Sequence, residues 1–551
     1  MKRVSLLLLL GLASGALLSA QDISGTIDGT VLDPTGAGVP NAKITVTNTD
    51  RNQIVRTMTT DATGTYSAPF IPIGNYELKV EAAGFQTATR AGIVLNVRDD
   101  LKINISLEIG QSTQTVVVRE TTTPVELGTS ASSTTITGTQ VRELSIATRN
   151  YEQLVALMPG VTANSTDELY LGVSAPAGTA ATLPFSMNGN RNSANNWTVD
   201  GADNVDRGSN LTLLNFPSID AISEFKVERS LYTADSGRAG GGQVSVATRS
   251  GTSQFHGSAY EFNRNDAYAA NNWYNNANRV NVVNGVAKVS PLRWNDFGYT
   301  FGGPVYFGRH YNKDKNKTFF FFSQEFRRII TYTTFQPTLP TTAMLQGNFP
   351  VPVCVSYTTS CQQTATQIAP AQFSANSAAY IKDMYSKLGV PADSITGGLY
   401  PERNVFNSRQ ELVRIDHSFN ERFSVWGRYL NDNIPTVEPG GLFQGSTIPG
   451  GATTNTNAPG RSIVVHALNT IRPTLLDEYG FNFSRGSILS TPAGLTNKAN
   501  NPDINPVEPF TNTQGVVPTV AFTGGTSILQ KQYSGFEKAV ATGITSRAPG
   551  N

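Results

Sequence analysis

The chain has 551 residues, more than one hydrophobic core usually organises, so we expect two to four domains. Its 42 basic and 41 acidic side chains give a formal net charge of +1, which argues against a nucleic-acid-binding protein with a basic excess. Hydrophobic residues make up 39%, below the roughly 45–50% of typical globular chains. Abundant Gly, Asn, Thr and Ser favour strands, tight turns and polar loops over helices.

Residues 1–20 are predicted to be a secretory signal peptide. Lys2 and Arg3 precede an apolar stretch, and Ser19 and Ala20 supply small residues at a cleavage point before Gln21. The alternative, a transmembrane helix, requires a longer apolar run. No later window has about 18 consecutive apolar residues, so any membrane role must use β-strands.

Residues 21–108 alternate apolar and polar side chains in short runs separated by Gly, Pro, Asp and Asn, which predicts a small antiparallel β-sandwich. The segment resembles the carboxypeptidase regulatory-like domain. That resemblance implies a transthyretin-like, carbohydrate-binding-like fold. It does not indicate a function, because the matching positions are core and turn residues. The residues that carry it are Gly29, Val31, Asp33, Val39, Ala42, Ile44, Val46, Gly64, Tyr66, Gly74, Tyr76, Gly84 and Phe85.

Residues 109–135 form a Thr- and Ser-rich linker that contains Thr115, Val116, Val117 and Val118. These four residues suit an extended strand. They are either the last strand of the sandwich, the first strand of the next domain, or a TonB box that pairs with a periplasmic partner by strand addition.

Residues 136–250 are predicted to form an α+β domain. Asn150 and Gln153 suggest a capped helix that ends at Pro159 and Gly160. The segments NYEQLVALMPGV, NGNRNSANNWTVDG, IDAISEFKV and SGRAGGGQVSVATRSGT together resemble the plug of Oar-like TonB-dependent transporters.

The plug motif positions within these segments are Asn188, Gly189, Arg191, Asp200, Gly201, Glu224, Arg238 and Arg249. We expect Arg191, Asp200, Glu224, Arg238 and Arg249 either to pair with charges on the barrel wall or to lie in solvent. The dipeptide Asp200-Gly201 favours a turn over a site.

Residues 251–551 are predicted to be the N-terminal part of an Oar-like antiparallel transmembrane β-barrel. Aromatic residues alternate in strand-like runs, and hairpins are expected around Asn420-Glu421 and around Pro473-Thr474. FGGPV, NKDKNKTFFFFSQE and VRIDHSFN also resemble the Oar-like barrel. We count about seven or eight strands, whereas plugged barrels close at about 22, so the expected barrel is incomplete. The predicted fold class is mainly β.

The side chains argue against an enzyme. The four histidines occupy no H-E-x-x-H pattern, and the chain has no G-x-S-x-G elbow or P-loop, so we predict no catalytic residue, metal or cofactor. Cys354 and Cys361 have no neighbouring zinc ligands, which favours a disulfide in an exported protein. Trp273 and Tyr274 lie in an Asn-rich loop, where they either stack on a sugar or peptide or simply pack.

The resemblance implies an outer-membrane receptor that imports a nutrient, with its N-terminal module in the periplasm. The expected partners are TonB of the inner-membrane energising complex, outer-membrane lipid and a small nutrient or oligomeric ligand, with no nucleic acid. A carbohydrate or a peptide is the ligand class considered. The alternative is a surface adhesion or carbohydrate-binding envelope protein that does not transport.

Overall fold

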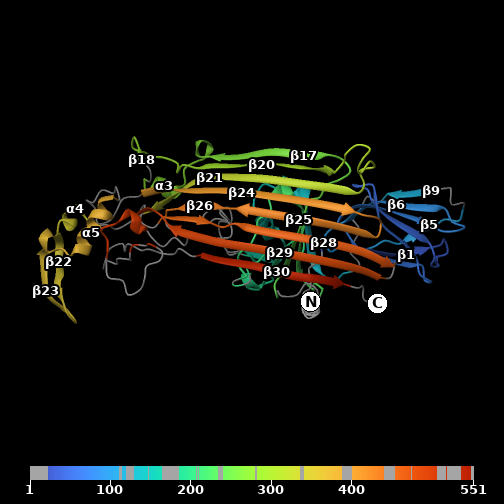
Figure 1. The fold of residues 1–551 in the computed structure, drawn as a ribbon, viewed down its shortest axis with the longest axis horizontal. Coiled ribbons are helices and arrows are strands. Elements are labelled where there is room, and N and C mark those ends of the chain that lie inside the picture. Colours follow the sequence, from blue (N-terminus) through green and yellow to red (C-terminus); the bar gives the residue numbers. More distant parts are fainter. Residues whose placement is uncertain are drawn as a thin grey trace, which may run out of the picture.

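The computed structural model describes residues 23–110, 115–119, 129–146, 148–163, 185–206, 208, 210–233, 240–279, 282–335, 340–387, 400–439, 453–472, 475–505, 515, 517 and 535–547. The predicted signal peptide lies outside these residues. The fold is mainly β, as the sequence predicts, and the molecule is elongated along the direction of its longest strands (Figure 1). Among the described residues, no helix has the length and apolar character needed to cross a membrane.

The first unit, called the sandwich, packs two sheets against each other at one end of the molecule (Figure 1). One sheet has the order β4-β1-β7, with β8 also paired to β1, and the other has the order β3-β2-β5-β6-β9. The predicted alternation is confirmed, because Val31, Ile44, Val46 and Tyr76 are all buried in the core between the sheets. The strands are β1 (Gly25–Leu32), β2 (Lys43–Asn48), β3 (Gln53–Thr59), β4 (Thr65–Ile71), β5 (Gly74–Glu81), β6 (Thr87–Leu95), β7 (Asp100–Lys102), β8 (Ile105–Ser106) and β9 (Thr115–Arg119).

The second unit, called the middle unit, spans residues 129–250 and is built on a five-stranded sheet of order β10-β15-β16-β13-β14. Its core includes Tyr151, Phe185, Trp197 and Phe225, whose rings pack edge-on or tilted. Its elements are β10 (Ser132–Thr137), α2 (Gly138–Glu143), η1 (Tyr151–Leu157), β11 (Val161–Ala163), β12 (Phe185–Met187), η3 (Asn192–Ala194), β13 (Asn196–Val199), β14 (Ala202–Asp203), η4 (Ile219–Ala221), β15 (Ile222–Ser230) and β16 (Gln243–Thr248).

The third unit is a ten-stranded antiparallel sheet, called the wall, whose long strands curve past the middle unit (Figure 1). Its path runs β17-β20-β21-β24-β25-β28-β29-β27-β26, and β30 pairs with β29. The strands are β17 (His256–Asn265), β20 (Arg293–Pro304), β21 (Thr318–Phe335), β24 (Tyr400–Ser418), β25 (Phe423–Asn433), β26 (Pro435–Glu438), β27 (Thr454–Asn457), β28 (Gly460–Arg472), β29 (Leu475–Pro492) and β30 (Gly535–Arg547).

The wall shows the alternation expected of a sheet with two different faces. On β20, Phe297, Tyr299 and Phe301 are exposed on the outer face, while Asp296 and Thr300 are buried on the inner face. The hairpin predicted around Asn420 and Glu421 is confirmed by the pairing of β24 with β25. Strands β28 and β29 also pair, although Pro473 and Thr474 lie outside the described residues.

Short elements cluster at the end of the wall opposite the sandwich (Figure 1). Ala379, Met384, Ile504 and Val517 form a small apolar cluster there. The elements outside the three units are η6 (Asp266–Tyr268), α3 (Trp273–Ala277), β18 (Val282–Val283), β19 (Val286–Ala287), α4 (Thr342–Leu345), β22 (Asn348–Tyr357), β23 (Cys361–Gln367), η7 (Pro370–Gln372), α5 (Ala375–Asp383), η8 (Tyr385–Lys387), η9 (Gly494–Thr496) and η10 (Lys498–Asn500).

Candidate functional site

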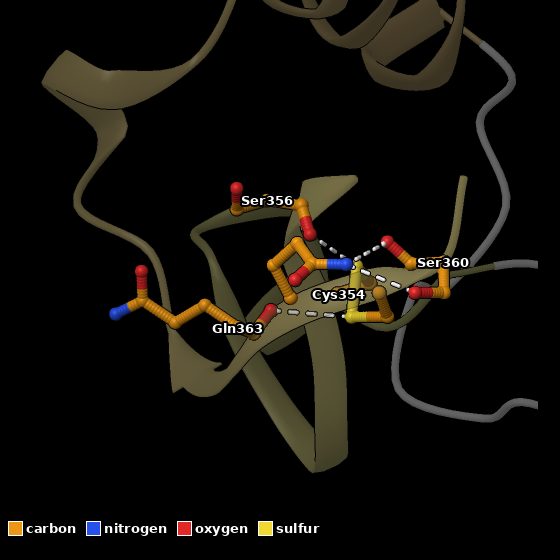
Figure 2. Close-up of a disulfide and its surroundings, with 6 residues drawn as sticks. Cys354, Ser356, Ser360 and Gln363 are labelled. Carbon is orange, nitrogen blue, oxygen red and sulfur yellow. Dashed lines mark hydrogen bonds between the residues drawn. A yellow bond between two sulfur atoms is a disulfide. The ribbon is translucent and has the colours of Figure 1, made fainter. Parts of the chain in front are cut away.

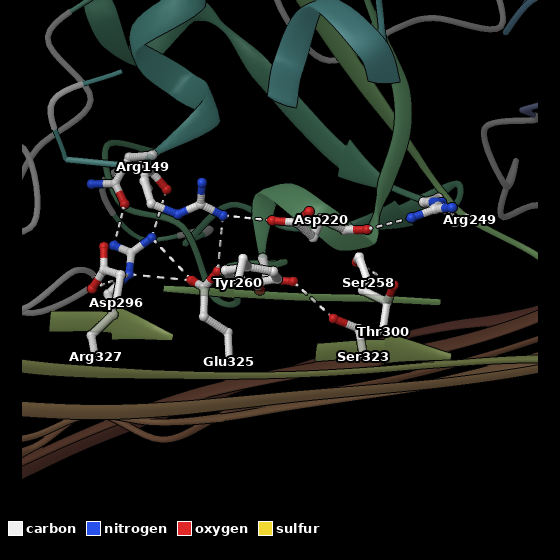
Figure 3. A network of polar contacts seen from close by, with 12 residues as sticks. Arg149, Asp220, Arg249, Ser258, Tyr260, Asp296, Thr300, Ser323, Glu325 and Arg327 are labelled. Atoms are coloured by element: carbon white, nitrogen blue, oxygen red, sulfur yellow. Dashed lines mark hydrogen bonds and ion pairs between the residues drawn. The ribbon is translucent and has the colours of Figure 1, made fainter. Parts of the chain in front are cut away.

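Arg149 joins the middle unit to the inner face of the wall (Figure 3). Its Nη2 lies 2.6 Å from Oδ2 of Asp220 in η4 and 3.4 Å from Oε2 of Glu325 in β21. Its guanidinium also lies over the ring of Phe262, 4.1 Å from the centroid. Burial raises the pKa of the Asp220 carboxyl, and the Arg149 charge acts in the opposite direction. A buried charge of this kind is stable only when it is paired, so the contact fixes how η4 faces β21.

Arg327 of β21 makes the reciprocal contact from the wall (Figure 3). It donates hydrogen bonds of 2.6 Å to the Asn150 side-chain oxygen and of 2.6 Å to the Arg149 carbonyl. Asn150 was predicted to cap a helix. It instead precedes the 3₁₀ helix η1 without a side-chain capping bond, because its side-chain oxygen accepts from Arg327. Thus two wall residues, Glu325 and Arg327, hold the start of η1.

Asp200 makes a second buried connection to the wall. It occupies a turn with φ +51°, where its carboxylate accepts hydrogen bonds of 2.8 Å from the Thr248 backbone N–H and of 2.8 Å from the Thr248 hydroxyl. Arg428 Nε lies 2.9 Å from Asp200 Oδ2, and Arg414 Nη1 lies 3.7 Å from Asp200 Oδ1. The predicted turn is therefore present, and its carboxylate also faces two wall cations.

Two other plug motif charges have partners that the sequence did not predict. Glu224 was expected to face wall charges or solvent, yet it accepts a hydrogen bond from the Val97 N–H of the sandwich. Burial raises the pKa of Glu224 to about 7, although the bond from Val97 acts in the opposite direction. Arg249 donates to the Asp220 carbonyl at 3.3 Å and lies over the Phe321 ring, 5.1 Å from its centroid.

The remaining plug motif residues make no wall ion pair among the described contacts. Asn188 and Gly189 have positive φ angles of +51° and +76°, which places them in a turn, and Asn188 donates to the Arg229 carbonyl at 2.9 Å. Gly201 follows Asp200 in its turn with φ +75°. Arg191 is exposed, and Arg238 lies outside the described residues.

The sandwich is held to the middle unit by buried charges. Asp99 Oδ1 lies 2.9 Å from Lys226 Nζ, and these side chains are only 3% and 1% exposed. Arg98 Nε lies 3.0 Å from Glu228 Oε2. Glu224, Lys226 and Glu228 alternate along β15, so one face of this strand meets the 96–99 loop of the sandwich.

The loop between β2 and β3 holds the sandwich to the wall. Arg51 Nη2 lies 3.2 Å from Asp416 Oδ1 of β24, and its guanidinium lies over the Phe319 ring, 4.8 Å from the centroid. Arg51 Nε also donates to the Gly251 carbonyl at 3.1 Å, and Gln53 contacts Ser418.

A cavity of about 560 Å³ lies where the sandwich, the middle unit and the wall meet. Arg51, Arg142, Arg249 and Arg422 contribute to its lining, together with Trp426. Among the described residues, no group of three or more His, Cys, Asp or Glu side chains is arranged to hold a metal ion.

The candidate TonB box lies on β9, at an edge of the sandwich. β9 pairs in parallel with β6, and Thr115 faces Thr87 while Val117 faces Thr89. The structure shows this segment as a strand paired with the sandwich, and its role as a TonB box stays a prediction. Among the described residues, this pairing leaves one edge of β9 without a neighbouring strand in that sheet.

Cys354 and Cys361 form a disulfide across the hairpin of β22 and β23 (Figure 2). Their Cα atoms are 5.7 Å apart. The hairpin lies at the end of the molecule opposite the sandwich (Figure 1), on the same side as α3, where Trp273 is 81% exposed.

Comparison with known families agrees with the architecture. Residues 247–544, more than half of the chain, match the outer membrane beta barrel domain. The chain belongs to this family. The wall is accordingly an outer-membrane β-barrel sheet, whose exposed aromatic face is the one suited to lipid. Residues 26–108 of this barrel-family protein match the carboxypeptidase regulatory-like domain, in agreement with the predicted sandwich.

One relative of this outer-membrane barrel protein is the TonB-dependent transporter Oar of Myxococcus xanthus, which is 29% identical over 329 residues. The match covers 58% of this chain and 28% of the relative's length. Similar solved structures include the Escherichia coli outer membrane transporter YddB (TM-score 0.43, 10% identity, 65% of this chain and 39% of that one). Another is the siderophore receptor PirA of Acinetobacter baumannii (TM-score 0.39, 11% identity, 70% and 44%).

Proposed function

We propose that this outer-membrane protein is a TonB-dependent importer in which the middle unit acts as the plug. The observation that carries the proposal is the kind of contact between the middle unit and the wall. Arg149, Asp200, Arg327 and Arg428 connect the two through ion pairs and hydrogen bonds. Polar contacts of this kind have alternative partners in water, so a plug held by them is able to leave the wall and return.

The likeness to the Oar transporter supports the same function. In this proposal the sandwich faces the periplasm and the hairpin of β22 and β23 faces the exterior. TonB then adds a strand to residues 115–118, and a nutrient passes the plug while it is displaced. No covalent step by this chain is part of the proposal.

Growth of a strain that lacks the gene tests the proposal. The strain and its complemented parent are compared on a panel of sole nutrients that includes iron chelates, sugars and peptides. If the protein is an importer, the strain should grow poorly on at least one nutrient, and the wild-type gene should restore growth on it. Equal growth on every nutrient, combined with lost surface attachment, would instead favour the adhesion alternative.

A further inference from the structure

The sandwich contacts two partners that must separate if the plug moves. The 96–99 loop binds the middle unit, while the loop between β2 and β3 binds the wall. Arg51 carries the wall contact, because it reaches Asp416, Gly251 and the ring of Phe319. The sandwich is thus fixed to both of its neighbours, and it lies across the end of the wall where the cavity of about 560 Å³ is found.

The charges at this junction form one continuous chain. Arg51 lies 3.2 Å from Asp416, and Asp416 lies 3.1 Å from Arg414. Arg414 lies 3.7 Å from Asp200, which also pairs with Arg428 at 2.9 Å. Because Asp416 is shared by Arg51 and Arg414, we expect loss of Arg51 to draw Arg414 toward Asp416 and away from Asp200. The contact of the sandwich would then be coupled to the contact of the middle unit.

The contact between the sandwich and the middle unit is the more enclosed of the two. Asp99 and Lys226 are almost fully buried, whereas the Arg51 side chain is 14% exposed. Lys226 also donates to the Arg98 carbonyl at 3.4 Å, and the Val97 N–H donates to Glu224. Opening the more deeply buried of two ion pairs costs more free energy than opening the partly exposed one, so the wall contact is expected to open first.

We propose that the sandwich is a latch: its Arg51–Asp416 contact with the wall must open before the middle unit leaves the barrel, and the sandwich and middle unit then move together. The inference rests on the proposed function in one respect. A pull applied to β9 acts on the sandwich, because β9 is an edge strand of its sheet.

Hydrogen exchange of the protein purified from outer membranes tests the coupling without any transport. The amide of Thr248 donates to Asp200 within the middle unit, and the same carboxylate pairs with Arg428 and Arg414 of the wall, so exchange of this amide should respond when the wall contact weakens. Arg51→Gln should accelerate exchange in β16, while Lys79→Gln, which removes an exposed pair with Glu81 on the sandwich, should leave it unchanged. Unchanged exchange in the Arg51→Gln protein would overturn the coupling.

Crosslinking during uptake tests the movement. The two native cysteines are paired, so introduced thiols are the only free ones among the described residues. A short, reducible bis-thiol crosslinker is applied to Gln53→Cys/Ser418→Cys, which joins the sandwich to the wall. The matched variant Arg98→Cys/Thr233→Cys joins the sandwich to the middle unit, where these side chains lie 3.0 Å apart.

The latch predicts that the crosslink between sandwich and wall abolishes uptake until a reductant is added. The matched variant replaces the Arg98 contact with Glu228 by a covalent link, so its uptake is compared with that of the same variant before crosslinking, and crosslinking should not lower it. Uptake through the first crosslink, or equal loss with both, would contradict the proposal. If the wild-type protein takes up nothing, the proposed import function fails, and the exchange measurement alone then decides whether the latch exists.

Discussion

Arg428 Nε lies 2.9 Å from Asp200 Oδ2, and both side chains are fully buried between the middle unit and the wall. Arg428 also donates to the Val199 carbonyl at 3.0 Å. We predict that Arg428→Gln weakens the attachment of the middle unit by about 3–5 kcal/mol, because Asp200 loses its shorter ion pair while it stays buried. The measurement is the urea concentration at which a protease first cleaves the middle unit.

The control for this variant is Arg422→Gln, which removes an arginine in the exposed turn between β24 and β25. Its cleavage midpoint should match the wild type. Equal midpoints for Arg428→Gln and Arg422→Gln would show that the buried pair does not hold the middle unit.

The folding stability of the middle unit should depend on pH through Glu152. This carboxyl is 1% exposed, both its oxygens lack hydrogen-bond partners in the described structure, and burial raises its pKa from 4.5 to about 7. A carboxyl whose pKa is raised on folding contributes stability below its unfolded pKa and loses it as the pH rises through the folded value. Between pH 4.5 and 7 the free energy of unfolding should decrease by about 3 kcal/mol.

The same cleavage midpoint, measured across this pH range, checks the prediction. In the Glu152→Gln protein, the cleavage midpoint should fall much less between acidic and neutral pH than in the wild type. The Glu421→Gln protein, changed in an exposed turn, should show the same pH dependence of the midpoint as the wild type. Parallel profiles for wild type and Glu152→Gln would exclude Glu152 as the titrating group.

The sandwich should fold alone. Residues 23–110 contain the apolar core of both sheets and no cysteine, and we expect a cooperative thermal transition by circular dichroism without added metal. Ile44→Ala should lower its stability by about 2–5 kcal/mol, because it leaves a cavity in that core. Lys79→Gln, on the exposed side of β5, is the control. A disordered spectrum from the isolated segment would contradict the prediction.

Uptake should be sensitive to the backbone of β9. Val117→Pro removes one N–H donor and fixes φ, so an added strand loses pairing and uptake should fall while outer-membrane assembly persists. Val117→Ala keeps the donor and should transport like the wild type. Wild-type uptake by the proline variant would place the TonB box elsewhere.

Cys354 and Cys361 should be linked to each other in cell-envelope material. The disulfide closes the hairpin of β22 and β23, and the predicted compartment is oxidising. Mass spectrometry of a non-reduced digest should detect the joined peptides. Recovery of both residues as free thiols would refute the expectation.

Local patterns predicted the parts of the fold that depend on local chemistry. The alternation of apolar and polar residues correctly predicted Ile44 and Val46 in the sandwich core, and the polar residues Asn420 and Glu421 correctly predicted a hairpin. Both patterns are contained in a few neighbouring residues, so they can be read from the sequence. The boundaries expected between the domains stay predictions.

The contacts between units were not predictable in this way. Glu224 faces the backbone of Val97, 127 residues away, and Arg51 faces Asp416. These contacts depend on how separately folded units dock, and no local period encodes that. One signal was present: Glu325 and Arg327 alternate on one face of a strand rich in phenylalanine, which indicates charges directed inward.

Energised import is tested by ligand accumulation in cells with and without TonB. The ligand is the nutrient identified by the growth panel, supplied in labelled form to cells that carry the wild-type gene. We predict accumulation inside the outer membrane when TonB is present, and only surface binding when TonB is deleted. Equal accumulation in both strains would contradict it.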